Sequence, residues 1–333
     1  MQKPNLPQPE GPRAIFAAKA LEVAPRILGL GDRDPASPTY GCFDRAWWHY
    51  RLSDFPSAWF QSAAYYLFLL HRLEAGAANP WRGRGRLLDW SRAAVGFTLS
   101  IAHRDGSLDE AYPNERSYCA TAFAACHLSE TVLGLGEGLG ERSGEERGEE
   151  LPEGLGRLGG WLLRRANPEL SNQEAAAALA LANLHLLSGE ARFREGAEAK
   201  VSGLLERRAR HGFFPEYGGL DVGYSSLTVG LLWKYARKTG SKEALAACRA
   251  EAGLLEGRIG EDGSFPAWQT SRGVQYVYPL GLAALGSAAA SKLAAGLAKG
   301  IAIAPGWLDD RYVTGLAIDY LEACEALEEV PAA

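Results

Sequence analysis

The hydrophobic positions of this chain follow two helical patterns that alternate along the sequence. Residues 118–126 and 175–182 are apolar or small on nearly every side, which is typical of a helix that is buried all round. Residues 193–208 are instead amphipathic, with one apolar stripe made of Phe193, Ala197, Val201, Leu204 and Leu205. Strand patterns are weak. Buried helices alternating with one-sided helices predict two layers, with the buried helices inside.

The same plan recurs six times, at intervals of about 50 residues. Each repeat has a Gly- or Asp-containing turn, an aromatic or acidic stretch and an Ala/Leu-rich helix, and the repeats begin near Asp54, Asp105, Pro168, Gly212, Asp262 and Gly306. The last repeat is as apolar as the middle ones, whereas the end of an open solenoid needs a polar face. We therefore predict an all-α fold, a single (α/α)6 toroid domain over residues 1–333, with residues 15–28 completing the outer layer.

One segment departs from the repeat pattern. Residues 134–156 are rich in Gly and Glu and contain few bulky apolar residues. Such a composition cannot order itself by burying apolar surface. We therefore expect a flexible insertion on the surface at 134–156.

Composition and charge exclude several classes of function. The 333 residues include 35 basic and 40 acidic ones, a net charge of −5, which argues against a nucleic-acid binder. Five scattered cysteines predict neither a disulfide framework nor a thiolate zinc site. We expect no membrane span and no signal peptide, and hence a cytoplasmic protein. No HExxH or EF-hand pattern occurs, so neither a metal nor a cofactor is expected.

The turns that precede the buried helices hold the unusual residues. Because every buried helix starts at the same end of the inner layer, these turns should converge around one mouth. A tyrosine stands at the start of four of these helices, at Tyr118, Tyr224, Tyr276 and Tyr312. A concave site with aromatic walls and a few polar groups suits a sugar, so the predicted ligand is a poly- or oligosaccharide.

Four residues at this mouth are candidates for catalysis. Glu216 and Tyr224 are separated by a glycine-rich step and are predicted to share one pocket, as acid or base groups. His49 is the one histidine predicted at the mouth, and Glu115 is a second carboxylate there. Each also has a structural alternative, such as a helix cap, an ion pair or a core tyrosine. The candidate substrate-binding residues are Arg45, Trp48, Asn114, Arg116, Tyr118, Gln173, Tyr217, Trp268 and Arg311.

The motifs DGSLDEAY, NQEAAAALAL and FPEYGGLDVGYSSL resemble the helical domain of heparinase II/III-type polysaccharide lyases. The EYGG segment is also similar to glucuronyl 5-epimerases. This resemblance covers roughly residues 40–328 and implies an (α/α)6 toroid that acts on uronate-containing saccharides. Where such lyases often carry an Asn-His pair, this chain has Asn172-Gln173.

Three functions remain open at this point. The first is a uronate lyase or 5-epimerase, with Asn114 and Arg116 on the carboxylate and His49 or Tyr224 transferring the proton. The second is a glycoside hydrolase that uses Glu115 and Glu216, since hydrolysis needs two carboxyl groups across the scissile bond. The third is a non-catalytic oligosaccharide-binding module in surface-polysaccharide synthesis.

Overall fold

The structure is a computed structural model that describes residues 9–75, 78–143 and 152–329. Within these ranges the chain is helical, and its β-contacts are isolated bridges outside any strand. The prediction of an all-α fold is therefore confirmed. Across the same ranges, no helix combines the length and the hydrophobicity that crossing a bilayer requires.

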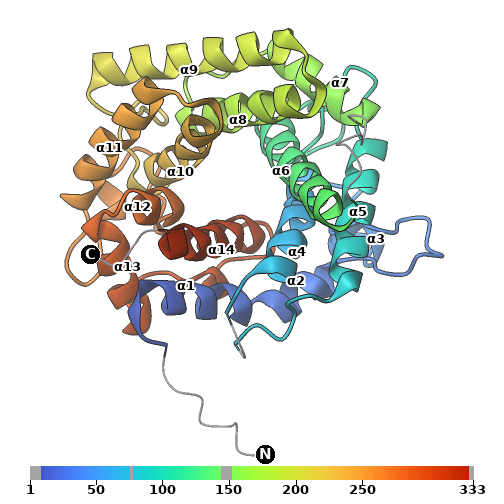
Figure 1. Ribbon diagram of the computed structural model, residues 1–333, viewed down its shortest axis with the longest axis horizontal. Helices are drawn as coiled ribbons and strands as arrows, with labels where there is room; N and C mark the ends of the chain where they lie inside the picture. Colours follow the sequence, from blue (N-terminus) through green and yellow to red (C-terminus); the bar gives the residue numbers. More distant parts are fainter. Residues whose placement is uncertain (1–8, 76–77, 144–151, 330–333) are drawn as a thin grey trace, which may run out of the picture.

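Six helices lie around a common centre (Figure 1). Each contacts the next along the chain, and the last of them contacts the first. They are α4 (Ala63–Arg72), α6 (Tyr118–Ser143), α8 (Ser171–Ser188), α10 (Val222–Thr239), α12 (Leu280–Ala284) and α14 (Val313–Glu329).

A second set of helices packs on the outside of the first. Its members are α1 (Gly11–Glu22), α5 (Gly85–Ser100), α7 (Glu153–Leu163), α9 (Ala191–His211), α11 (Lys242–Glu256) and α13 (Ala288–Ala298). Helix α1 lies against both α13 and α14, with Phe16 edge-on to Tyr320 at a ring-centroid distance of 5.3 Å. The N-terminal helix therefore lies beside the last helix of the chain. Residues 15–28, predicted to supply one outer helix, instead span most of α1 and most of a second helix, α2 (Ala24–Leu30), with Val23 between the two.

The two helical patterns read from the sequence correspond to these two positions. Every residue from Ala175 to Ala182 in α8 is buried, because α8 contacts α6, α9 and α10 at once. In α9 the stripe residues Phe193, Ala197, Val201 and Leu204 are buried, while Arg194 and Glu198 are exposed. An apolar stripe is enough for α9 because it packs inward on one side only.

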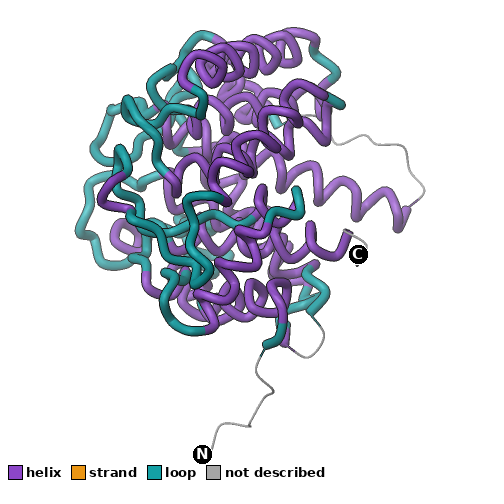
Figure 2. The backbone as a smooth tube through the Cα atoms, turned by 90° about the vertical axis from the view of Figure 1, so that its left-hand side faces the viewer, coloured by secondary structure: helices purple, strands orange, loops and turns teal. Residues whose placement is uncertain are grey.

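The segments between helices gather on one side of the molecule (Figure 2). They include the short helices α2 (Ala24–Leu30), α3 (Arg45–Trp48), η1 (Ala58–Ser62), η3 (Ala267–Gln269) and η4 (Pro305–Trp307). All six inner helices begin on this side, because each is entered from these connections. The predicted convergence of the turns at one end is therefore present.

Two of the turns are built alike, at Asp105-Gly106-Ser107 and Asp262-Gly263-Ser264. In both, the Asp side chain accepts hydrogen bonds from the backbone N–H and the hydroxyl of the Ser. The central glycines have φ of +92° and +77°. A Cβ on Gly106 would lie 2.1 Å from the carbonyl oxygen of Arg157. Glycine is thus required both by the backbone conformation and by the close approach of α7.

The expected loop at 134–156 is partly helical. Helix α6 continues to Ser143, and α7 begins at Glu153. Leu135 and Leu155 are buried, so the apolar residues at both ends of the segment pack on the body and extend the flanking helices. Residues 144–151 lie outside the described ranges.

Candidate functional site

A cavity of about 260 Å³ opens where the inner helices begin. All six of these helices contribute to its wall, either with a residue of their first turn or with one just before it. These residues are Ser62, Cys119, Asn172, Tyr224, Tyr278 and Tyr312. Since a helix N-terminus carries partial positive charge, the backbone around the cavity favours an anionic ligand.

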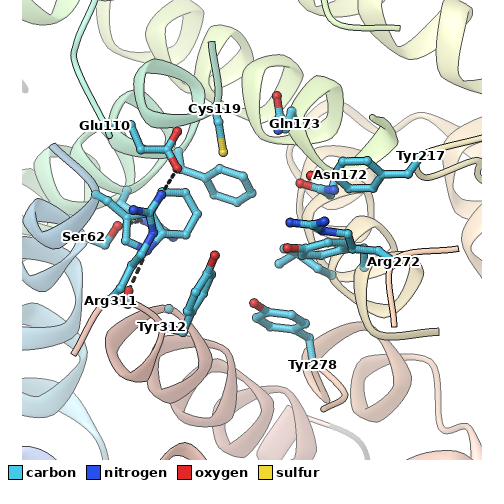
Figure 3. Close-up of a pocket in the computed structure, with 16 residues that line it drawn as sticks. Ser62, Glu110, Cys119, Asn172, Gln173, Tyr217, Arg272, Tyr278, Arg311 and Tyr312 are labelled. Atoms are coloured by element: carbon cyan, nitrogen blue, oxygen red, sulfur yellow. Dashed lines mark hydrogen bonds and ion pairs between the residues drawn. The ribbon is translucent and has the colours of Figure 1, made fainter. Parts of the chain in front are cut away.

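Aromatic side chains form much of the wall. Trp59 is edge-on to Phe123 at 5.5 Å and to Tyr312 at 5.9 Å between ring centroids. On another side Tyr217 stacks on Tyr224 at 6.2 Å. Figure 3 shows the phenol groups of Tyr278 and Tyr312 directed toward the middle of the cavity. The wall therefore combines aromatic ring faces with hydroxyl groups.

Two arginines reach the cavity, and their surroundings differ. Arg311 forms an ion pair with Glu110, which also accepts a hydrogen bond from the Ser117 hydroxyl at 2.6 Å. The guanidinium of Arg272 lies 5.0 Å from the ring centroid of Tyr217 and has no ion-pair partner within the described ranges. Arg272 is therefore the cation left for a ligand.

Asn172 and Gln173 stand side by side at the start of α8 and both line the cavity. The amide oxygen of Gln173 accepts from the side chain of Asn167 at 3.0 Å, which leaves its NH₂ group without a partner among the described residues. Asn172 Nδ2 donates to Glu216 Oε2 at 2.7 Å, and its amide oxygen is likewise unpartnered there. This corner of the cavity thus presents two open amide groups (Figure 3).

Glu216 lies behind Asn172 and has no exposed surface. In addition to the side-chain amide of Asn172, its backbone N–H donates to Glu216, at 2.7 Å from Oε1. The Thr228 hydroxyl lies 3.2 Å from the same oxygen. Burial raises the pKa of Glu216 to about 8, despite these hydrogen bonds. Glu216 therefore positions Asn172 and is not itself in reach of a ligand.

His127 also lines the cavity, one turn deeper along α6 than Phe123. Its Nδ1 is 2.8 Å from the Ser62 hydroxyl, and its ring stacks on Tyr65 at 5.9 Å. Burial lowers the pKa of His127 to about 3. The imidazole is therefore neutral at physiological pH.

Four of the residues predicted from the sequence do line this cavity: Tyr224, Tyr217, Gln173 and Arg311. Glu216 and Tyr224 do not share the pocket as predicted, because only Tyr224 reaches it. The two are still connected, since the Thr228 hydroxyl lies 3.2 Å from Glu216 Oε1 and 3.1 Å from the backbone carbonyl of Tyr224.

The predicted residues near α3 lie elsewhere. Arg45 sits over the rings of Trp48 and Tyr50, and the Trp48 indole donates to the carbonyl of Leu30 at 2.8 Å. His49 is exposed and packs between Trp48 and Tyr50. These side chains hold the 45–50 segment together, and none of them lines the cavity.

The loop at 114–116 is also outside the cavity lining. The carboxylate of Glu115 accepts from the backbone N–H groups of Glu110 and Ala111 at 3.1 and 2.7 Å. Arg116 pairs with Asp105, and Asn114 and Arg116 adopt positive φ of 62° and 55°. The trio shapes the turn that delivers Glu110 to the cavity.

Two further predicted residues have other contacts. The Tyr118 hydroxyl donates to Glu174 at 2.5 Å and lies 2.9 Å from the ammonium of Lys200, in a polar cluster beside the cavity. Trp268 is 82% exposed and borders a separate groove of about 290 Å³.

The site residues chosen from the sequence did not include His127 or Arg272, although Arg272 belongs to one of the turns predicted to meet at the mouth. The sequence favours a core position for His127, because the apolar residues around it conceal how deep the cavity reaches. Arg272 lies in an extended segment before the short helix α12, where helical periodicity gives no signal. Asn172 belongs to the same predicted turn as Gln173, but only Gln173 was chosen as a site residue.

Among the described residues, no group of three or more His, Cys, Asp or Glu is arranged to hold a metal ion. No protein-family model matches the chain, and a search of curated protein sequences finds no significant relative. The geometry of the site is therefore the basis for assigning a function.

Proposed function

We propose that the chain is an (α/α)6 toroid whose cavity binds an acidic sugar and abstracts the proton next to its carboxylate, as a uronate lyase or 5-epimerase does. The observation that carries this proposal is the position of Arg272. Its guanidinium, which has no ion-pair partner among the described residues, lines a cavity that is walled by tyrosines and surrounded by six helix N-termini. A ligand with one carboxylate and several hydroxyl groups matches all three features.

The carboxylate would be bound by Arg272 together with the NH₂ group of Gln173. Hydrogen bonds between charged partners are shorter and stronger than neutral ones, and both donors are held from behind, Arg272 by Tyr217 and Gln173 by Asn167. Neutralising the carboxylate acidifies the adjacent C–H bond, because the negative charge that develops in the transition state is then stabilised.

His127 and a tyrosine would handle the protons. In elimination, the unpartnered nitrogen of neutral His127 takes the C5 proton, the C–H electrons form the C4–C5 double bond, and the C4–O bond breaks. The leaving oxygen takes a proton from Tyr312, whose phenol points into the cavity. In epimerisation the C4–O bond stays intact, His127 keeps the proton it removed, and Tyr312 delivers a proton to the other face of C5. The low pKa of His127 rises when an anion binds nearby, which brings it closer to the range of an effective base.

Hydrolysis by a carboxyl pair has less support. Glu110 is the one carboxylate that lines the cavity in the described structure, and it is engaged by Arg311 and Ser117. Glu115 is bound to backbone N–H groups and Glu216 is buried. A second carboxyl group facing the same ligand, which hydrolysis requires, is therefore missing from the lining.

The test is incubation with a panel of uronate-containing oligosaccharides, with ultraviolet detection of unsaturated products and detection of deuterium uptake at C5 in heavy water. We expect one of the two signals from the wild type and its loss in His127→Gln. We expect Arg272→Ala to weaken binding of the substrate. Arg116→Ala, which changes an arginine outside the cavity, is its matched control. Binding without either signal would identify a non-catalytic oligosaccharide-binding protein and contradict the proposal.

A further inference from the structure

Glu216 differs from the other buried glutamates among the described residues. Glu174 has Lys200 at 3.3 Å, Glu251 has Arg208 at 3.0 Å, and Glu130 has Lys238 at 3.1 Å. Glu216 is at least as buried as these, and it has no cation within the described ranges. Its polar partners are the amide and backbone N–H of Asn172 and the hydroxyl of Thr228. An uncompensated buried carboxylate is costly unless it takes up a proton.

The proton on Glu216 determines which end of the Asn172 amide faces the cavity. An ionised carboxylate only accepts hydrogen bonds. It therefore binds the NH₂ group of Asn172, which is the arrangement seen at Oε2, and the amide oxygen of Asn172 then faces the ligand. A protonated Oε2 donates instead, so it pairs with the amide oxygen and turns the NH₂ group into the cavity. The backbone N–H of Asn172 donates to Oε1 in both states.

The groups around Glu216 do not fix whether its carboxyl group is ionised or protonated. On its own loop, Asp221 disfavours the charged form, and Tyr217 directs its ring toward Arg272. On α8, Glu174 is occupied by Lys200 and Tyr118. Tyr224 on α10 and Cys119 on α6 are titratable as well, and burial raises the pKa of both. Ser271 Oγ donates to the backbone carbonyl of Glu216 at 2.5 Å, and the guanidinium of the next residue, Arg272, lies over the Tyr217 ring.

We propose that Glu216 is a proton-carrying positioning residue: when protonated it turns the NH₂ group of Asn172 toward the ligand, so that binding of a sugar carboxylate is coupled to uptake of one proton. The inference rests on the proposed function, since it assumes an anionic ligand. The step breaks no covalent bond in the ligand. The proton comes from solvent and resides on Oε2, and Asn172 then becomes a third donor beside Gln173 and Arg272.

The test is calorimetric titration with D-glucuronate at about pH 9, in two buffers with different ionisation enthalpies. Since the pKa of Glu216 is raised to about 8, the wild type should take up close to one proton on binding. Its affinity should fall about tenfold per pH unit above that pKa and stay level just below it. D-glucose, which lacks the carboxylate, is the control ligand.

Glu216→Gln is the decisive variant, because a glutamine at this position donates to the Asn172 oxygen at every pH. We expect it to bind glucuronate at about pH 9 as well as the wild type does at about pH 7, with no proton uptake. A melting curve checks that the variant is folded; if it is not, the wild-type proton count still decides the question.

The outcomes separate the two proposals. Absence of glucuronate binding at about pH 6 would contradict the proposed function, and the inference with it. Binding without proton uptake in the wild type at about pH 9, or equal uptake in wild type and Glu216→Gln, would overturn the inference alone. Loss of binding in a folded Glu216→Gln would also overturn it.

Discussion

Both ends of the inner helices carry charged side chains, but the two ends differ in how many of these side chains have ion-pair partners. At the C-terminal end, Lys234 contacts Glu130 and Glu322, Lys238 contacts Glu130, and Arg72 pairs with Glu325. A cavity of about 380 Å³ opens there as well. At the N-terminal end the guanidinium of Arg272 has no ion-pair partner in the described part of the chain, and open amide groups and phenols face the cavity. A cavity with charges is therefore not sufficient to identify a site. What distinguishes the N-terminal end is that some of its donors, Arg272 and Gln173 among them, have no partner among the described residues.

The helix dipoles explain this difference. The C-terminal ends of helices carry partial negative charge, so cations there are stabilising without any ligand. Lys234, Lys238 and Arg72 all occupy the later turns of α10 and α4. At the N-terminal ends the backbone itself is positive, and an additional unpaired arginine increases the unfavourable charge. Such an arrangement is relieved by an anion.

The largest predicted effect concerns the paired end. Lys234→Met leaves Glu130 and Glu322 buried without their shared cation, which should cost about 3–5 kcal/mol of unfolding free energy. Urea denaturation measures it. Arg157→Ala is the control, because its ion pair with Glu153 is exposed and should contribute less than about 0.5 kcal/mol. A loss below about 1 kcal/mol in Lys234→Met would show that this end does not stabilise the fold.

The next effect concerns the open end. Arg272→Ala should leave stability nearly unchanged. The guanidinium has no ion-pair partner in the described ranges, so its removal leaves no carboxylate there without its cation. The substitution should weaken glucuronate binding by about 1.5–3 kcal/mol, roughly 10- to 150-fold, as expected for losing a charged hydrogen-bond donor. Calorimetry and a melting curve separate the two quantities. An equal loss of binding in Arg116→Ala would mean that the carboxylate binds elsewhere.

The third prediction tests whether His127, at the inner end of the cavity, is shielded from water. An unfolded histidine protonates below about pH 6.5, whereas His127 stays neutral until about pH 3. Stability contributed by neutral His127 is therefore lost as the pH falls below 6.5. At 1.36 kcal/mol per unit, wild type should lose about 2 kcal/mol more than His127→Gln between about pH 7 and pH 5. Parallel stability curves for the two proteins would show that His127 is solvated.

The sequence predicted the fold better than the site. Helical periodicity distinguishes α8 from α9, because a helix buried on all sides is apolar all round and a helix buried on one side has a single apolar stripe. It also implies that the turns meet, and Tyr224, Gln173 and Arg311 follow from that. It cannot show which residues of a turn face inward: Glu115 and Arg116 are equally polar, but their side chains bind the backbone and Asp105. Nor can it show that Glu216 is covered by Asn172, since that contact joins two repeats.

The smallest predicted effect concerns Trp268, which borders the groove next to the Arg272 segment and is 82% exposed. Its ring is available for stacking on a sugar that extends from the cavity, and such a contact is worth about 0.5–1.5 kcal/mol. Trp268→Ala should therefore weaken binding of a uronate tetrasaccharide by roughly 2- to 13-fold, while binding of glucuronate itself is unchanged. Stability should change by less than about 0.5 kcal/mol, because little of the side chain is buried. Calorimetry with both ligands measures the difference. An equal loss for both ligands would mean that Trp268 shapes the cavity through the Arg272 segment, whereas no loss for either would confine the ligand to the cavity and restrict recognition to a single terminal sugar.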